Sequence, residues 1–294
     1  MFDWWQILFN SVVTGSLYLI AAVGLTLTYG LSKFPNFAHA EFMTLGAYAG
    51  YFIAKQLGLG LPLAFVFAFL VVGMVGVLCS RGIFQPLANR GATLIHLMVA
   101  SIALGFILRY SIGAATDWDP LYFTSTWSAF DIGPIRVTGL WIWLIATALL
   151  LSLVMHFILI KTKIGKAIRA TGSNPELALA SGININRVIL VTWFVGAGLA
   201  AVAGIFRGAD TQIWPMTGWD MILPVFAVTI LGGIGNFYGA IVAAFIIGLA
   251  ENVGVVLLAS LGLSTTYRIG IAFAILIITL IVKPRGLAMF FRRA

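Results

Sequence analysis

Charged residues are scarce in this 294-residue sequence: Asp, Glu, Lys and Arg make up 9% of it, whereas hydrophobic residues make up 61%. A soluble domain normally carries about 25% charged residues, so an ordinary soluble protein is excluded. Apolar runs of roughly 20 residues, enough to cross a bilayer as a helix, recur along the whole length. The composition predicts an all-α, polytopic transmembrane helical bundle with about 8–10 spans, some of them broken helices. It also predicts one transmembrane domain over residues 1–294, without a separate soluble domain.

Cysteine pairs and catalytic motifs are also missing. The single cysteine, Cys79, cannot form an internal disulfide and is expected to be an inert packing residue. The sequence contains no GxxxxGKS/T phosphate loop, no HExxH and no GxSxG. Neither nucleotide hydrolysis nor hydrolase chemistry can therefore be assigned to it. We expect no enzyme activity, no catalytic residue and no cofactor bound by this chain.

The net charge of +8 would suggest a nucleic-acid partner in a soluble protein. Here the basic residues gather in short loops beside the apolar runs, so no nucleic-acid partner is expected. Residues 161–187 hold five Lys or Arg and one Glu, whereas residues 114–138 hold three Asp and one Arg. The positive-inside rule places the first interval in the cytoplasm and the second outside, together with residues 209–220. Arg109 and Arg207 fall near the outer ends of their spans, where snorkelling to the interface would satisfy them.

The two chain ends follow from the same rule. The C-terminal tail has four basic residues and no acidic one, so it is predicted to be cytoplasmic. With about nine spans, the N-terminus then lies outside. The chain is expected to be a multi-pass protein surrounded by membrane lipid.

Polar residues interrupt the apolar pattern directly after the first span, in GLSKFPNFAHAEF. Asn36, His39 and Glu41 stand there at a depth where charge is costly and seldom faces lipid. His39 and Glu41 suggest a metal site or a proton relay, but no second His or Cys lies nearby, and His96 and His156 are near inner membrane edges. We therefore expect no metal, and expect Glu41 to pair with a donor inside the bundle or to cap a half-helix beginning near Asn36.

A second interruption lies in residues 221–262, which are too long for one apolar span and contain a glycine-rich break. Two spans meeting at a tight turn are predicted. Asn236 follows this break as Asn36 follows the first. In transporters built from repeats, two such interruptions in separate halves of the chain indicate a pathway near the membrane midplane. The alternative is that this short similarity between the two breaks is due to chance. Glu251 is deeply placed and either lines a polar path or holds a structural hydrogen bond. The candidate pathway residues are Asn36, His39, Glu41, Asn236 and Glu251.

The basic interval 161–187 has the signals of one short surface helix over residues 175–181. Asn174 stands at the N-cap position, Pro175 at the first helical position, and Gly182 where a left-handed residue ends a helix. Glu176 lies in the first turn, where a carboxylate favours the positive end of the helix dipole. The other side chains are small or apolar. The segment either docks into a groove of another protein or is a solvated turn that joins two spans.

Four stretches together resemble the LivH-type permease subunits of branched-chain amino acid ABC importers, and they span nearly the whole chain. They are GLTLTYGLSKFPNFAHAEFMTLGAYAGY, FQPLANRGATLIHLMVASIALGFILR, KTKIGKAIRATGSNPELALASGI and LGGIGNFYGAIVAAFIIGL. The sequence departs from the family at Ala40, where relatives commonly have glycine. This resemblance implies a multi-pass protein of a prokaryotic inner or plasma membrane. It also implies a LivM-like permease partner, two cytoplasmic ATPase subunits that bind the ATP, and an extracytoplasmic substrate-binding protein.

The same resemblance implies a role for the cytoplasmic interval 161–187, which would carry the helix that contacts the ATPase. The matching positions are Asn174, Pro175, Glu176, Ala178, Gly182 and Ile183. The expected function is inward translocation of branched-chain or related amino acids, driven by ATP hydrolysis on separate subunits. Two alternatives stay open: an ion-coupled secondary transporter that uses the buried acids, and an ABC permease for another small polar solute such as urea or an amide.

Overall fold

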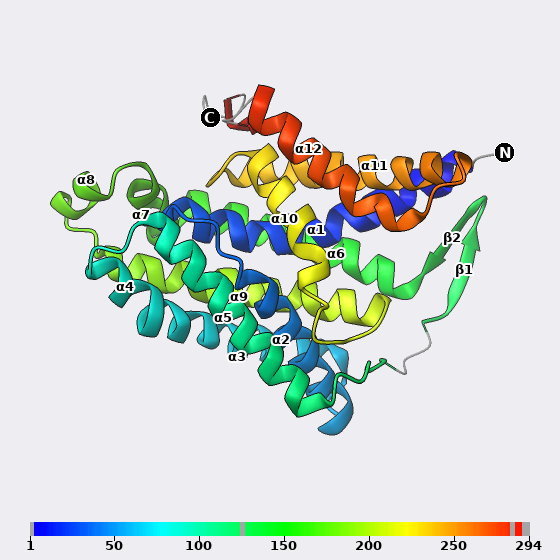
Figure 1. Cartoon of the computed structure of the whole chain (residues 1–294), viewed down its shortest axis with the longest axis horizontal. Coiled ribbons are helices and arrows are strands. Elements are labelled where there is room, and N and C mark those ends of the chain that lie inside the picture. The colour runs from blue at the N-terminus through cyan, green and yellow to red at the C-terminus, as the bar shows by residue number, and fades with distance from the viewer. Residues whose placement is uncertain (1–2, 124–126, 283–285, 290–294) are drawn as a thin grey trace.

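The computed structural model describes residues 3–123, 127–282 and 286–289, and these fold into one helical bundle with a small two-stranded hairpin (Figure 1). The elements are α1 (Trp4–Ser32), α2 (His39–Tyr51), α3 (Gly60–Cys79), α4 (Gln85–Asn89), α5 (Leu94–Thr116), β1 (Ala129–Ile132), β2 (Ile135–Thr138), α6 (Gly139–Lys161), α7 (Lys163–Ser173), α8 (Pro175–Ala180), α9 (Ile185–Asp210), α10 (Trp219–Gly232), α11 (Phe237–Ser260) and α12 (Arg268–Val282). The all-α expectation is confirmed.

Seven helical segments among the described residues are long and apolar enough to cross a membrane. One of them is continuous over Gly60–Asn89, because a π-helical turn joins α3 to α4. Two further segments also pass through the bundle. Each consists of an extended stretch followed by a shorter helix, α2 or α10 (Figure 1). The expectation of eight to ten spans is met only when these two broken passages are counted.

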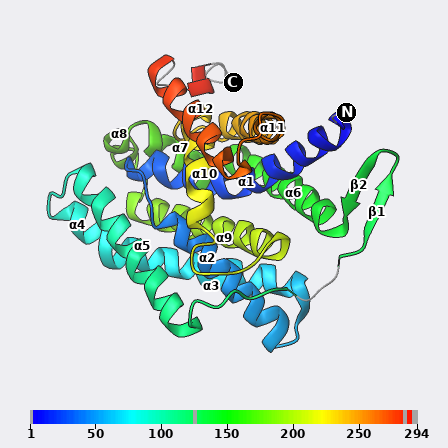
Figure 2. The same cartoon turned by 45° about the vertical axis from the view of Figure 1, so that its right-hand side comes forward.

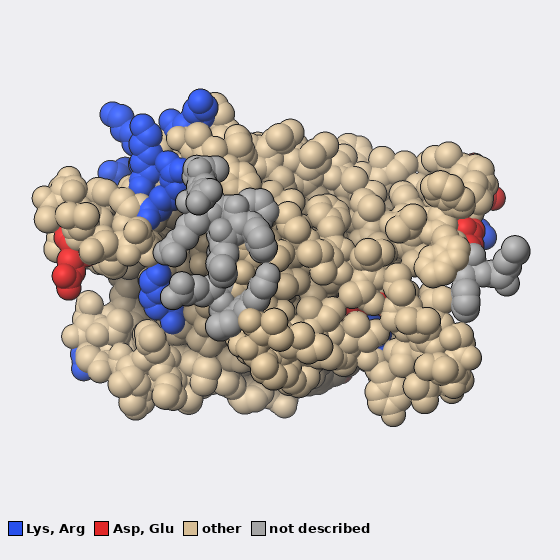
Figure 3. Space-filling model, turned by 90° about the horizontal axis from the view of Figure 1, so that it is seen from above, with Lys and Arg blue, Asp and Glu red and all other residues tan. Residues whose placement is uncertain are grey.

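The bundle has two distinct ends, which we name by their contents. The basic end carries α4, α7 and α8, and the hairpin end carries the start of α1 and the strands β1 and β2 (Figures 1 and 2). Gln6 fixes the hairpin to α1, because its side chain accepts a hydrogen bond from the Arg136 amide at 2.7 Å and donates one to the Arg136 carbonyl at 3.2 Å. Figure 3 shows Lys and Arg gathered at the basic end, whereas the middle of that face is almost uncharged.

The core is built around α1 and α9, the most buried of the long helices. They pack against each other, and close approach is possible because glycines meet at the crossing: a Cβ on Gly196 would lie 2.9 Å from the carbonyl oxygen of Gly24. Such small-residue contacts let van der Waals packing hold helices together in lipid. The outer helices α3, α6 and α12 leave many large apolar side chains exposed, as a lipid-facing surface requires.

Two interruptions of the bundle correspond to each other when they are aligned at a shared aromatic-proline pair. Residues 33–38 join α1 to α2 and residues 211–218 join α9 to α10. Each contains an aromatic residue followed by proline, Phe34-Pro35 in the first and Trp214-Pro215 in the second. Each ends at a small N-cap residue, Ala38 or Gly218.

The packing follows the same correspondence. α3 packs against α9 as α11 packs against α1, and α2 packs against α3 as α10 packs against α11. The two half-helices run in opposite directions: α2 ends beside Phe123 of the hairpin end, whereas the turn after α10 lies against Gly30 at the far end of α1. The fold is therefore an inverted repeat, an arrangement that many secondary transporters use around a central site.

Three expectations about the loops need correction. Residues 209–220, placed outside the membrane from their acidity, turn back into the bundle, where Ile213 is fully buried and Thr217 is 2% exposed. The structural counterpart of Asn36 is Met216 and not Asn236, so the echo between the two asparagines does not mark the repeat. Residues 161–187 form two surface helices where one was expected, because α7 precedes α8.

Other expectations are met. Two helices, α10 and α11, do meet at a glycine-rich turn, where Gly233 and Gly235 adopt positive φ angles of 94° and 78°. The four basic residues of the C-terminal tail lie outside the described residues. The hairpin of β1 and β2, in register from Ala129 opposite Thr138 to Ile132 opposite Ile135, was not expected from the sequence.

Candidate functional site

The N-terminal ends of α2 and α10 meet in the middle of the bundle. The Gly218 amide donates a hydrogen bond to the Thr44 hydroxyl at 3.1 Å, and the rings of Phe37 and Phe226 lie 4.9 Å apart. A Cβ on Gly218 would collide with the carbonyl oxygen of Ala40, so the backbones touch here because position 218 is glycine. We call the contact between residues 37–44 and residues 217–226 the half-helix junction.

Glu41 is fully buried beside this junction and pairs with Arg109 of α5. The Arg109 Nε donates to Glu41 Oε1 at 3.1 Å, its Nη2 donates to the same oxygen, and its guanidinium lies 4.3 Å above the ring of Trp219 on α10. The expectation that Glu41 pairs with a donor inside the bundle is confirmed. The expectation that Arg109 snorkels to an interface is wrong: its side chain is 4% exposed and joins α2, α5 and α10.

His39 and Asn36 hold the start of α2 in place. The His39 ring is 1% exposed, and its Nε2 lies 3.0 Å from the carbonyl oxygen of Ala21, halfway along α1. Asn36 is 2% exposed and accepts a hydrogen bond from the Ala38 amide at 3.1 Å, which forms a local turn before the helix. Among the described residues, no group of three His, Cys, Asp or Glu side chains could hold a metal ion.

The remaining two pathway candidates lie on α11, away from the half-helix junction. Asn236 caps that helix by accepting a hydrogen bond from the Gly239 amide at 2.9 Å, close to the basic end. Glu251 is 1% exposed and accepts a hydrogen bond from the Tyr18 hydroxyl of α1 at 2.7 Å. The five predicted residues therefore do not share one site: Asn36, His39 and Glu41 belong together, and Asn236 and Glu251 do not join them.

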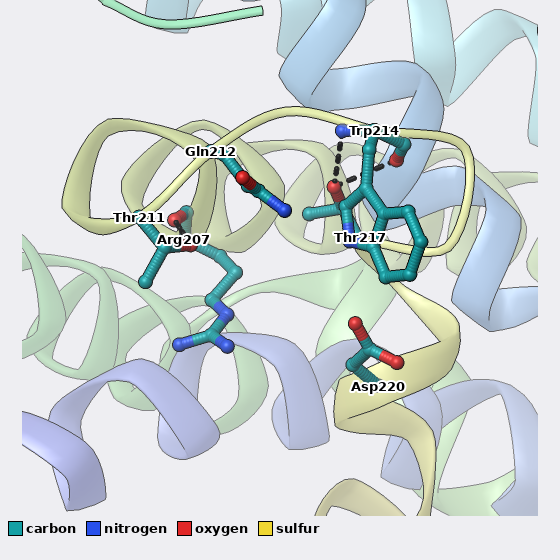
Figure 4. A pocket seen from close by; sticks show the side chains of 6 residues that line it. All are labelled: Arg207, Thr211, Gln212, Trp214, Thr217 and Asp220. Atoms are coloured by element: carbon teal, nitrogen blue, oxygen red, sulfur yellow. Dashed lines mark hydrogen bonds between the residues drawn. The ribbon is translucent and has the colours of Figure 1, made fainter. Parts of the chain in front are cut away.

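Sequence reasoning missed a polar cavity beside the half-helix junction, on the side of the hairpin end. The polar cavity has a volume of about 310 Å³ and lies between the end of α9, the 211–218 segment and the start of α10 (Figure 4). Its lining residues are Arg207, Thr211, Gln212, Trp214, Thr217 and Asp220. The repeated aromatic-proline pair was the signal that could have found it, because it shows that residues 211–218 re-enter the bundle as residues 33–38 do.

The predicted surface helix exists as α8, with Asn174 accepting a hydrogen bond from the Leu177 amide at 3.0 Å. Gly182 adopts a φ of 81°, as expected of a helix-ending glycine, and the Ile183 amide closes the turn on the Ala178 carbonyl at 3.0 Å. Leu177 and Leu179 are 65% and 63% exposed, and within the described part of the chain α8 packs closely against α7 and α9 alone. At the basic end, outside the apolar band, two exposed leucines on a capped helix favour docking over a solvated turn.

Comparison with known proteins identifies the family. The family described as "Branched-chain amino acid transport system / permease component" matches residues 7–280. The chain belongs to this family. It is accordingly a multi-pass permease component of a transporter and is not itself an enzyme.

Individual relatives of this permease family match almost the full chain. A probable branched-chain amino acid transport permease protein LivH of Methanocaldococcus jannaschii is 32% identical, covering 96% of this chain and 91% of the relative. The LivH permease of the high-affinity branched-chain amino acid system of Escherichia coli K12 is 31% identical, covering 96% and 94%. The corresponding BraD permease of Pseudomonas aeruginosa is 27% identical, covering 98% and 96%. No solved structure matches the chain.

Proposed function

We propose that this permease is the membrane-spanning subunit of an ABC importer that moves branched-chain amino acids into the cell. The names of the LivH and BraD relatives support the solute class. The proposal that ATP hydrolysis on a separate subunit drives transport rests on α8. This capped helix exposes two leucines, and the sequence that contains it has no phosphate-binding loop of its own. A LivM-like permease, two ATPases that bind the ATP and an extracytoplasmic binding protein complete the proposed complex in a prokaryotic cytoplasmic membrane.

The proposed orientation puts the basic end in the cytoplasm. Lys161, Lys163, Lys166 and Arg169 are exposed around α7 at that end, as the positive-inside rule favours for a cytoplasmic face. The hairpin end, with the start of α1, then faces outward. In this orientation α8 faces the cytosolic ATPase, and the polar cavity opens on the side from which a binding protein delivers solute.

One continuous helix connects α8 to the half-helix junction. α9 begins four residues after Ser181, the C-cap of α8, and runs to Asp210, where the 211–218 segment leads into α10. α7 is also fastened to the end of α1, because the Lys33 ammonium donates a hydrogen bond to the Gly172 carbonyl at 3.0 Å. Displacement of α8 by an ATPase would thus be carried by α9 to the place where the two half-helices meet, which is how we propose that access alternates.

Leu177→Asp with Leu179→Asp tests this assignment. Both side chains project from α8, so their replacement should leave the fold intact while abolishing ATPase docking, with uptake reduced roughly 100-fold or more, as expected when two buried anchors of an interface are lost. Co-purification of the ATPase with the permease measures docking, and labelled leucine uptake into proteoliposomes measures transport.

Leu261→Asp is the matched control, because Leu261 is 73% exposed in a turn at the hairpin end, on the far side of the bundle from α8. This variant should retain both docking and uptake. Normal docking and uptake by the double α8 variant would show that another surface receives the ATPase.

The main alternative is a secondary transporter in which the buried acids couple solute to an ion. Glu41 and Glu251 are its natural groups, but one oxygen of each already accepts a hydrogen bond, from Arg109 and from Tyr18. A coupling ion would have to compete with these donors for the carboxylates. This alternative predicts solute uptake by the purified chain without any ATPase.

A further inference from the structure

The polar cavity holds two opposite charges that face the same space. Arg207 comes from the last turn of α9 and Asp220 from the first turn of α10, and both are partly buried. Figure 4 shows the guanidinium and the carboxylate on opposite sides of the cavity, with Gln212, Trp214 and Thr217 beside them. Among the described residues the one ion pair is that of Arg109 with Glu41, so Arg207 and Asp220 approach without joining.

Two other polar side chains of the cavity have hydrogen-bond partners within the protein. The Thr217 hydroxyl donates to the Trp214 carbonyl at 2.7 Å and accepts from the Trp214 amide at 2.9 Å. Gln212 accepts a hydrogen bond from the Tyr122 hydroxyl at 3.0 Å. The Asp220 carboxylate also accepts a hydrogen bond from the Trp214 side chain. Because no ion pair joins Arg207 to Asp220, both charged groups can still bind a solute. The volume of about 310 Å³ is at the lower limit of small-molecule sites, which suits a small solute.

A second cavity of about 80 Å³ adjoins the first and shares Arg207 and Asp220 with it. It lies against α1 and α6, and Asp210 and Arg268 are also in its wall. The Asp210 carboxylate accepts a hydrogen bond from the Trp141 indole at 2.8 Å. The apolar part of its wall is formed by Val13, Leu17, Leu140, Leu144, Phe206 and Met221. These six residues form one apolar wall of a cavity that is otherwise mostly polar, directly beside the two opposite charges.

We propose that Arg207 binds the carboxylate and Asp220 the ammonium group of a free α-amino acid, whose apolar side chain lies against the apolar wall that α1 and α6 contribute to the second cavity. The inference rests on the proposed function, since it assigns a site to the solute of that importer. A guanidinium matches a carboxylate through two parallel hydrogen bonds, and a carboxylate accepts hydrogen bonds from an ammonium group. A neutral sugar or amide would leave both charges without a counterpart, so the pair selects a zwitterion.

Arg207 and Asp220 lie on different helices, so a solute bound to both would connect these helices. Arg207 is carried by the long helix α9 and Asp220 by the half-helix α10, and only residues 211–218 connect them. A zwitterion held by both would tie the two helices together at the half-helix junction. Solute in this site and an ATPase on α8 would then act on the same two helices.

Arg207→Gln and Asp220→Asn, made separately, test the proposal in the complete complex with a saturating binding protein. Each variant should lower labelled leucine uptake roughly tenfold or more, the loss expected from one charge-assisted hydrogen bond. ATP hydrolysis stimulated by the binding protein should stay near the wild-type rate. Arg136→Gln and Asp131→Asn are matched controls, because these opposite charges face each other across the hairpin at the same end, and they should leave uptake unchanged.

A competition experiment separates solute binding from a structural role. Leucine binding to the permease complex in nanodiscs is competed with 4-methylpentanoate, which lacks the ammonium group, and with 3-methylbutylamine, which lacks the carboxylate. Neither should compete well in the wild type. The acid should gain at least tenfold against Asp220→Asn, and the amine against Arg207→Gln.

Two results would overturn the proposal. One is leucine uptake at the wild-type rate by both variants. The other is that leucine, 4-methylpentanoate and 3-methylbutylamine keep the same relative affinities in both variants as in the wild type. A wild-type complex that takes up leucine equally well with and without ATP would instead contradict the proposed function, so the two failures can be told apart.

Discussion

The half-helices α2 and α10 both follow an extended segment with an aromatic-proline pair, but the charged side chains at their starts differ in their contacts. At the start of α2, Glu41 and Arg109 are joined in a buried ion pair that is closed to solvent. At the start of α10, Asp220 and Arg207 face an open cavity and do not pair. A buried charge whose partner is missing is costly, so the first pair locks three helices together. Arg207 and Asp220 are partly solvated, and no ion pair between them has to break before they bind a solute. The inverted repeat thus places a fixed ion pair at the start of α2 and a proposed solute-binding site at the start of α10.

The largest predicted effect comes from breaking the fixed side. Arg109→Leu leaves the Glu41 carboxylate buried and unpaired, which should destabilise the protein by about 3–5 kcal/mol. Thermal unfolding in detergent measures the change. Adding Glu41→Gln to this variant should recover part of the loss, because the second replacement removes the unpaired charge.

Arg207→Gln is the matched control for this comparison and should cost less than about 1 kcal/mol, since its charge is partly solvated. Equal stability losses for Arg109→Leu and Arg207→Gln would show that the starts of α2 and α10 do not differ as described.

A smaller effect is expected where the two half-helices touch. Gly218→Ala adds a Cβ that collides with the Ala40 carbonyl, so α2 and α10 must move apart at a cost of about 1–3 kcal/mol. Because the half-helix junction widens, the uptake rate should fall even under conditions in which the variant is still fully folded. The measurements are thermal unfolding and leucine uptake on the same preparation.

Gly270→Ala on α12 is its control. A Cβ there meets no atom within 4 Å, so this variant should be neutral or slightly stabilised by the higher helix propensity of alanine. If Gly218→Ala behaved like this control, the close contact between the half-helices would be unimportant.

The long helices were predictable because hydropathy and length determine them locally. The apolar runs of roughly 20 residues that recur in the sequence include those that form α5 (Leu94–Thr116) and α6 (Gly139–Lys161). The cap of α8 at Asn174 was predictable for the same reason, since the N-cap, Pro175 and Gly182 are adjacent in sequence.

The interior of the site was not predictable from local signals. The partner of Glu41 lies 68 residues away, and Arg109 near a span end is indistinguishable from a snorkelling arginine until the fold places Glu41 beside it. Asp220 was placed outside because acidic residues are common in external loops, although the tertiary fold returns its segment to the bundle. α7 was missed because its basic residues suggest a solvated loop, whereas burial of Ile168 against the bundle gives it a fixed face.

Leucine uptake into proteoliposomes with and without the ATPase subunits tests the central claim most directly. The account predicts uptake only when the permease pair, the ATPase with ATP and the binding protein are all present. Uptake at an undiminished rate by the purified chain alone, driven by an ion gradient, would contradict it.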